Sequence, residues 1–354
     1  MKKIIITTLM ILALLMGQAV MGAASASSFE TGSKDNSSYT MEQIQEMLLD
    51  YFASQNIDYP LGSDEFYYYA LNQLLEESDP LLAQHKNYDL ISAYLAHYIA
   101  TDEAIYFNLE TEKNLALASN NTEMTSALTD AQDSPTFFEE HDFLSTSIGD
   151  LRAKYASPTE EKIILPATVE PAAIASYTPS KAVSYAGKWA GDKSNEKHNP
   201  SYPYYKKKDC TNFVSQCLRA GGLSMKGSSN SIGIHASTKN WYCKYIEEWH
   251  GNSALKGFSL TSSWCRVSDL NSYLTAKAKA KVHTTKVATL IKKCEAGDVV
   301  QLAHNDTGEV YHSIIISYRT SSTAKYCAHS NAQTDTPVSN IPTSNLKFVL
   351  FDLT

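Results

Sequence analysis

The stretch that decides the fold of the second half of the chain is residues 209–222, DCTNFVSQCLRAGG. Its apolar side chains recur three and four residues apart, which is the spacing of one face of an α-helix; they are Phe213, Val214, Cys217 and Leu218. Gly221 and Gly222 follow, and glycine readily adopts the backbone conformation that ends a helix. The stretch therefore predicts an amphipathic helix that begins at Cys210 and stops at the glycines.

The two cysteines of this helix differ in their surroundings. Cys210 lies at the helix start, where unpaired amide groups and the helix dipole favour a thiolate. Lys206, Lys207 and Lys208 add positive charge just upstream. Cys217 lies within the apolar face, which is typical of a cysteine that serves as a small buried hydrophobic residue. We therefore interpret Cys210 as a candidate nucleophile and Cys217 as a core residue.

A nucleophilic thiol needs a base, and histidine is the usual one. His312 opens an apolar strand, HSIIIS, and His329 ends another, AKYCAH. Side chains alternate along a strand, so His329 and Asn331 point to the same sheet face. Either of them could orient the ring of His312. The alternative for each histidine is a core residue whose ring nitrogens have hydrogen-bond partners.

Along the rest of the chain, the spacing of apolar residues changes from that of helices to that of strands. Helical spacing is present over 41–51, 65–77 and 88–99, and Thr40 with Gln43 matches a capping box. Strand patterns separated by turn residues follow in the second half, over 298–302, 311–318, 324–331 and 346–351. Helices followed by an antiparallel sheet predict an α+β protein with a mainly α N-terminal domain.

Charge divides the chain in the same way. Residues 27–170 carry 26 Asp and Glu against 6 Lys and Arg, a formal charge of −20. Residues 171–354 carry 12 against 22, a formal charge of +10, and contain all six cysteines. Such asymmetry favours separate domains. We predict a disordered segment at 27–40, an acidic helical domain at 41–155, a proline-containing linker at 156–176 and a second domain at 177–354.

The first 26 residues have the layout of a secretory signal peptide. A short positive start precedes the largely apolar run Ile4 to Met16, and Ala24-Ser25-Ala26 is a small-residue cleavage site. The alternative is a membrane anchor, but a span needs about 20 apolar residues and Gln18 interrupts this run. We expect a secreted or cell-wall-associated protein without a membrane span after cleavage.

Other classes of site lack a sequence signature. There is no C-x-x-C and no H-E-x-x-H, so no metal is expected, and no glycine-rich nucleotide loop or other cofactor motif is present. The lysine run 206–208 is more typical of a solvated surface than of a nucleic-acid site. In an exported protein one disulfide could form, with Cys243 and Cys265 as a candidate pair.

The second half resembles a known family. Asp209 to Cys217, Ala220 to Gly222, Gly297-Asp298, the His312 strand and His329-Ser-Asn331 follow the order of the secreted bacterial putative amidase domain. That domain is similar to the papain-like NlpC/P60 and CHAP cell-wall cysteine hydrolases. The resemblance covers about 177–354. It implies an α+β, papain-like (NlpC/P60-type) catalytic domain, with helices packed on an antiparallel sheet.

The resemblance also implies roles. The matching motif positions imply that Cys210 is the nucleophile and His312 the general base. The third, polar residue of the catalytic set would be His329, with Asn331 as the alternative. An oxyanion-hole donor would come from the Cys210 amide and a side chain within 199–205. The implied activity is an exported cysteine amidohydrolase that cleaves an amide bond, with cell-wall peptide as substrate. Alternatives are a non-catalytic wall-binding module and an acyltransferase that uses the same residues.

Two further expectations concern partners. The +10 half suits an anionic surface such as phosphate polymers of a cell wall, since opposite charge raises the encounter rate. The −20 half could dock over the catalytic cleft and restrain it. In the alternative arrangement the two domains are tethered and barely touch.

Overall fold

The computed structural model describes residues 35–118, 124, 142–156, 162–165, 176–250 and 253–354. The predicted signal peptide at 1–26 lies outside these ranges. The chain from residue 36 to residue 354 folds into one compact unit. No helix within the described ranges has both the length and the apolar character that crossing a membrane requires.

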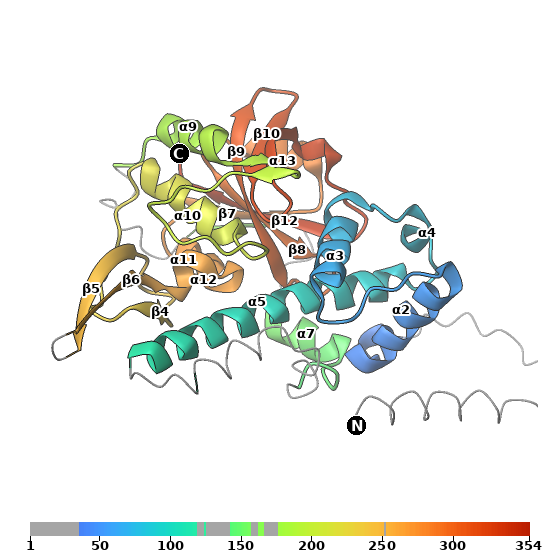
Figure 1. Cartoon of the computed structure of the whole chain (residues 1–354). Helices are drawn as coiled ribbons and strands as arrows, with labels where there is room; N and C mark the ends of the chain where they lie inside the picture. The colour runs from blue at the N-terminus through green and yellow to red at the C-terminus, as the bar shows by residue number, and fades with distance from the viewer. Residues whose placement is uncertain (1–34, 119–123, 125–141, 157–161, 166–175, 251–252) are drawn as a thin grey trace, which may run out of the picture. The chain divides into compact units, whose positions relative to one another are not determined.

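A seven-stranded antiparallel sheet lies at the centre of this unit (Figure 1). In spatial order its strands are β1 (Lys162–Ile164), β7 (Ala280–Thr284), β12 (Leu346–Asp352), β8 (Val299–His304), β9 (Val310–Arg319), β10 (Ala324–Ala328) and β11 (Gln333–Pro337). All neighbouring pairs are antiparallel. A bulge between Leu302 and Ala303 shifts the register of β8 against β9.

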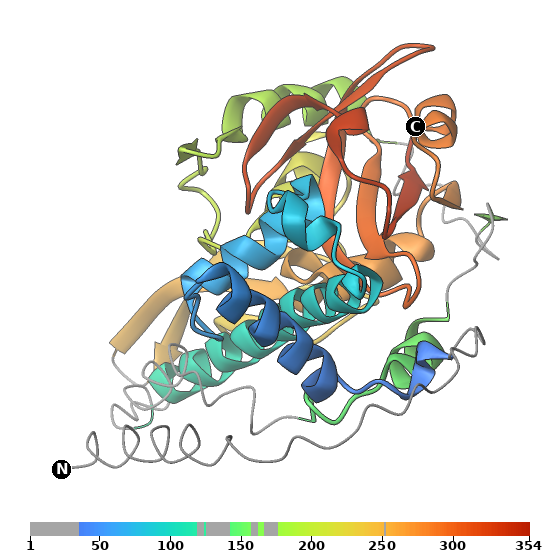
Figure 2. The same ribbon diagram turned by 90° about the vertical axis from the view of Figure 1, so that its right-hand side faces the viewer.

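Helices pack on both faces of this sheet. The described helices are α2 (Met41–Gln55), α3 (Asp64–Glu76), α4 (Pro80–Ala83), α5 (Tyr88–Ala118), α7 (Ile148–Tyr155), α9 (Pro179–Trp189), α10 (Cys210–Ala220), α11 (Ser262–Cys265), α12 (Val267–Thr275) and α13 (Val287–Lys293). Figure 2 shows α2, α3 and the long α5 in blue and teal beside the orange and red strands. Helices α9, α10 and α12 pack against β9.

Successive side chains along a strand point to opposite faces of the sheet, and the two faces form two hydrophobic cores. Val300 and Leu302 of β8 belong to a first core, which the strands share with α2, α3 and α5. Val299 and Ala303 belong to a second core, shared with α9, α10 and α12. Phe107, in the second half of α5, is buried in the second core. Helix α5 therefore ties the N-terminal helices to both faces of the sheet.

Several smaller elements complete the fold. Strands β4 (Gly233–His235), β6 (Ser253–Thr261) and β5 (Cys243–His250) form a three-stranded sheet, and β2 (Gly191–Asp192) pairs with β3 (Asn195–Glu196). Short 3₁₀ turns lie at Asn36–Ser38 and Val338–Asn340. The turn at Asn36–Ser38 is held because Arg152 Nη1 donates to Ser37 Oγ at 2.6 Å.

The structure confirms the α+β class and the main helix and strand predictions. Thr40 caps α2 through the predicted capping box, since Gln43 N donates to Thr40 Oγ1 and Thr40 N donates to Gln43 Oε1. The predicted helix over 88–99 continues to Ala118. Part of the predicted linker forms β1, and part of the predicted disordered segment forms the turn at Asn36–Ser38. The division into two domains stays a prediction, although α5 packs directly against β8 and β9.

Candidate active site around Cys210

Cys210 is the first residue of α10, as the sequence predicts. The helix packs against β9, and its first turn lies beside Ser313 of that strand. Thr211 Oγ1 and Ser313 Oγ are 3.0 Å apart, and Cys210 Sγ lies 3.7 Å from Thr211 Oγ1. Ser313 thus faces α10, and because side chains alternate along a strand, His312 lies on the opposite face of β9, with Leu302 of the first core. Within the described residues the Cys210 thiol and the His312 ring share no hydrogen bond.

The thiol is covered. Only 4% of Cys210 is exposed, and burial followed by the charge of Glu103 raises its pKa well above the usual range. Glu103 comes from α5, where burial raises its own pKa to about 8. Burial, followed by the charge of Cys210, raises the pKa of Tyr67 in α3. Burial thus opposes the thiolate that a helix N-terminus favours, and the ionised nucleophile stays a prediction.

His312 lies opposite Leu302 on β8, next to the β-bulge. Its ring is 1% exposed, and burial lowers its pKa to about 3, so it is neutral. Among the described residues, its Nε2 is a buried nitrogen without a hydrogen-bond partner. Leaving a buried nitrogen without a hydrogen-bond partner costs about 1–3 kcal/mol. A role for this ring nitrogen in accepting a proton or in binding a substrate would explain why it has no partner.

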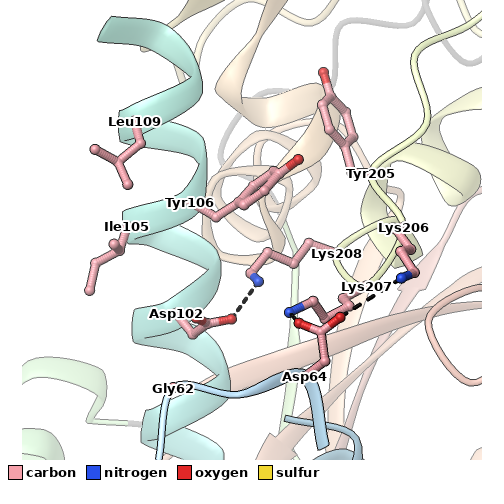
Figure 3. A pocket seen from close by; sticks show the side chains of 10 residues that line it. All are labelled: Gly62, Asp64, Asp102, Ile105, Tyr106, Leu109, Tyr205, Lys206, Lys207 and Lys208. Carbon is pink, nitrogen blue, oxygen red and sulfur yellow. Dashed lines mark hydrogen bonds and ion pairs between the residues drawn. The ribbon is translucent and has the colours of Figure 1, made fainter. Parts of the chain in front are cut away.

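The three lysines before Cys210 do not face the sulfur. Lys206 and Lys207 both pair with Asp64, and Lys208 Nζ lies 2.5 Å from Asp102 Oδ2 (Figure 3). Lys208 also lies 4.8 Å from the ring centroids of Tyr67 and Tyr106. These partners come from α5 and from α3 with its neighbouring residues, so the N-terminal helices clamp the segment that carries the nucleophile.

His329 does not lie against His312. Its Nδ1 is 2.6 Å from Asp209 Oδ2, its Nε2 is 2.9 Å from the Trp189 carbonyl, and its ring stacks on Phe213 at 4.0 Å. Both ring nitrogens therefore have partners elsewhere. In this arrangement the prediction that His329 orients His312 is not supported. His329 follows the end of its strand and instead contacts Asp209, next to the N-terminus of α10.

Asn331 also lies away from His312. Its Nδ2 donates to Glu76 Oε1 of α3 at 3.1 Å. Within the described residues neither Asn331 nor His329 hydrogen-bonds to His312. Alternation places the two residues on one side only while the strand continues, and β10 ends at Ala328. Ser330 and Asn331 instead have positive φ angles of 56° and 97°, which belong to a turn.

Glu196, Asp209 and His329 form a cluster that sequence spacing could not reveal. Their ligand-capable atoms lie within 4.8 Å of one another, and the residues come from three separate segments. The set could hold a metal ion. The 2.6 Å separation of His329 Nδ1 and Asp209 Oδ2 is that of a charge-assisted hydrogen bond, so a proton holds the pair in this arrangement.

Stability should depend on this proton. Burial lowers the pKa of His329, but the hydrogen bond to Asp209 and the charges of Asp209 and Glu196 outweigh it and raise the pKa above 6.5. A raised folded-state pKa stabilises the fold fully below about pH 6.5 and loses that effect as pH rises through the folded value. The free energy of unfolding lost in His329→Gln should therefore shrink as pH rises above about 6.5. Urea titrations of both proteins would measure it, and a pH-independent difference would contradict the ion pair.

The oxyanion-hole donor remains a prediction. Within the 199–205 stretch, Asn199 Nδ2 donates to the Tyr185 hydroxyl at 3.0 Å. The amide of Asn212, in the first turn of α10, donates to the Pro203 carbonyl and to Asp209 Oδ1. All six cysteines are buried and unpaired, so the candidate pair Cys243 and Cys265 is not joined in this structure.

Comparison with known proteins identifies the second half of the chain. Residues 176–351 match the family described as "Putative amidase domain", so this part is amidase-like. The uncharacterized protein YjcM of Bacillus subtilis is 28% identical over 177 residues, which are 48% of this chain and 35% of that protein. The uncharacterized protein YhbB of the same organism is 29% identical over 140 residues, 40% of this chain and 37% of that protein.

The match to these relatives is partial. The chain spans just over a third of the length of each curated relative. No solved structure gives a significant match. The family match over residues 176–351 therefore indicates amide hydrolysis at a coarse level.

Proposed function

We propose that this protein is an exported cysteine amidohydrolase with a papain-like catalytic region, in which Cys210 is the nucleophile and His312 the general base. One observation carries the proposal. The helix that begins at Cys210 packs on β9, where Thr211 Oγ1 lies 3.0 Å from Ser313 Oγ, and the residue before Ser313 is a histidine with a buried, unpartnered Nε2. The amidase-like match over 176–351 supports amide bonds as the substrate class.

The chemistry follows from these two groups. His312 Nε2 accepts the thiol proton, and the sulfur bonds to the amide carbon. The C–N bond breaks as the imidazolium returns the proton to the leaving amine, which leaves a thioester on Cys210. Water then gives a proton to His312 and attacks the thioester. The acid is released and the thiol is restored, so one amide and one water yield one acid and one amine.

The covered arrangement is a resting state in this proposal. Both reacting groups are neutral because they are buried, with the pKa of Cys210 raised and that of His312 lowered to about 3. Substrate can reach a thiol that is 4% exposed, and His312 can reach that thiol, only after the surrounding elements move. Opening would hydrate both groups and return their pKa values toward the usual ranges, which is the condition for proton transfer.

The substrate proposed is the peptide part of a cell wall, and the location is the secreted or wall-associated fraction. The leader-like residues 1–26 and the +10 charge of residues 171–354 support this choice. A positive surface raises the local concentration of an anionic wall. The support comes from sequence, and the catalytic roles above do not depend on it.

The test is to incubate the full chain with purified peptidoglycan and identify the released fragments by mass spectrometry. Hydrolysis should yield fragments with a new carboxylate and a new amine. A product joined to an added amine would indicate acyl transfer instead. Sedimentation of the protein with the wall and no released fragment would favour a non-catalytic binding module and contradict the proposed hydrolase.

A further inference from the structure

A cavity of about 300 Å³ lies between the N-terminal helices and the segment that leads to Cys210 (Figure 3). This volume is at the lower end of the range for small-molecule sites. One wall is cationic and is formed by Lys206, Lys207 and Lys208. The other walls contain Asp64, Asp102 and a set of apolar and aromatic side chains, namely Ile105, Leu109, Tyr106 and Tyr205. A ligand that fits would carry an anionic group next to an apolar part.

The cavity has one positive charge in excess. Lys208, whose side chain is 5% exposed, is paired with Asp102. Lys206 and Lys207 share the single carboxylate of Asp64. Among the described residues that line the cavity, three cations thus face two anions. An excess of a single positive charge suits a monoanion such as a carboxylate better than a phosphate dianion.

The cavity also adjoins the segment that leads to the proposed nucleophile, because Lys206, Lys207 and Lys208 line it and Cys210 follows two residues later. Lys207 and Lys208 lie over the ring of Tyr67, at 6.0 Å and 4.8 Å from its centroid. A ligand anchored at the lysines would therefore be held by the segment that carries Cys210.

We propose that this cavity binds the free carboxylate of a short peptide substrate, with Lys207 and Lys206 as its cationic partners in place of Asp64. The inference rests on the proposed function and deepens it, because it names the end of the substrate that the segment preceding Cys210 would hold. In this view Asp64 competes with the ligand: it keeps the lysines paired while the site is empty, and the incoming carboxylate displaces it.

The test is calorimetric titration of the full chain carrying Cys210→Ala, which cannot consume the probe. The probes are N-acetylated trialanine, its C-terminal amide and inorganic phosphate. The free acid should bind at least about tenfold more tightly than the amide, because a charge-assisted hydrogen bond is lost. Adding Lys207→Gln to this variant should weaken binding of the free acid by a similar factor. Lys239→Gln, at an exposed lysine outside the cavity, should leave binding unchanged.

Asp64→Asn gives the sharpest result, because it should tighten binding of the acid, by about threefold or more, as it frees two lysines. A merely structural role of Asp64 would weaken binding instead. Equal affinity for acid and amide, weaker binding in Asp64→Asn, or tighter binding of phosphate than of the peptide acid would each overturn the proposal. Because binding is measured without the nucleophile, failure of the hydrolase assay and failure of this inference are distinguishable.

Discussion

Replacing Cys210 with alanine should lower the rate of amide cleavage by about 10³-fold or more, because removal of a covalent nucleophile leaves only binding and oxyanion contributions. The variant should fold as the wild type does. Cys210 contributes a small side chain at the start of α10 and no disulfide. Fragment release from peptidoglycan, followed by mass spectrometry, gives the rates of both proteins.

Cys217→Ala is the matched control. Cys217 lies in the same helix, is fully buried in the second core, and has no role in the proposed chemistry. Its replacement leaves a small cavity and should cost about 1 kcal/mol of stability, with little change in rate. Equal losses of activity in both variants would mean that the helix needs its sulfur atoms for packing. In that case Cys210 would not be the nucleophile.

Residues 177–354 alone should not form a stable fold. The first core of the sheet is completed by α2, α3 and α5 (Figure 2). Without these helices, buried side chains such as Leu302, Tyr311 and Ile314 would face water, at about 1.5–3 kcal/mol each. That loss is comparable with the whole stability of a typical domain, about 5–15 kcal/mol.

Polar contacts between α5 and the sheet region also predict that the fragment 177–354 is unstable on its own. Ser92 Oγ of α5 lies 3.2 Å from His304 Nε2, and His97 Nδ1 lies 2.9 Å from Glu309 Oε2, both in buried surroundings. Circular dichroism during heating, together with dye binding to exposed apolar surface, would measure the result. A fragment that unfolds cooperatively at the melting temperature of the full chain would show that the two parts are independent and would contradict this prediction.

The elements that sequence predicts well are those with a strong local signal. The helix at 210–220 has an apolar face and a double glycine, and α2 has a capping box, so both helices begin at the predicted residue. Strands β8, β9, β10 and β12 follow from short apolar runs bounded by turns. The β5–β6 hairpin was not predicted, because Tyr245 and Trp249 remain exposed and leave its apolar pattern incomplete.

The site shows where local patterns fail. The packing of the helix that begins at Cys210 on the strand that carries His312 could be predicted, since the sequence contains both motifs and indicates the position of the strand. The pKa of the thiol could not, because it depends on burial and on the charge of Glu103 in α5, more than 100 residues earlier in the chain. The partner of His329 was missed for the same kind of reason. Asp209 adjoins the nucleophile in sequence, but the contact with His329 forms only in the folded protein.

The most direct test of the central claim is to trap the covalent intermediate. The full chain is mixed with a peptidoglycan peptide and quenched in acid during turnover, and its peptides are mapped by mass spectrometry. We predict an acyl adduct on the peptide that carries Cys210, none on the other five cysteines, and no adduct or cleavage in Cys210→Ala. Cleavage by Cys210→Ala at the wild-type rate, or an adduct on a different residue, would contradict the account.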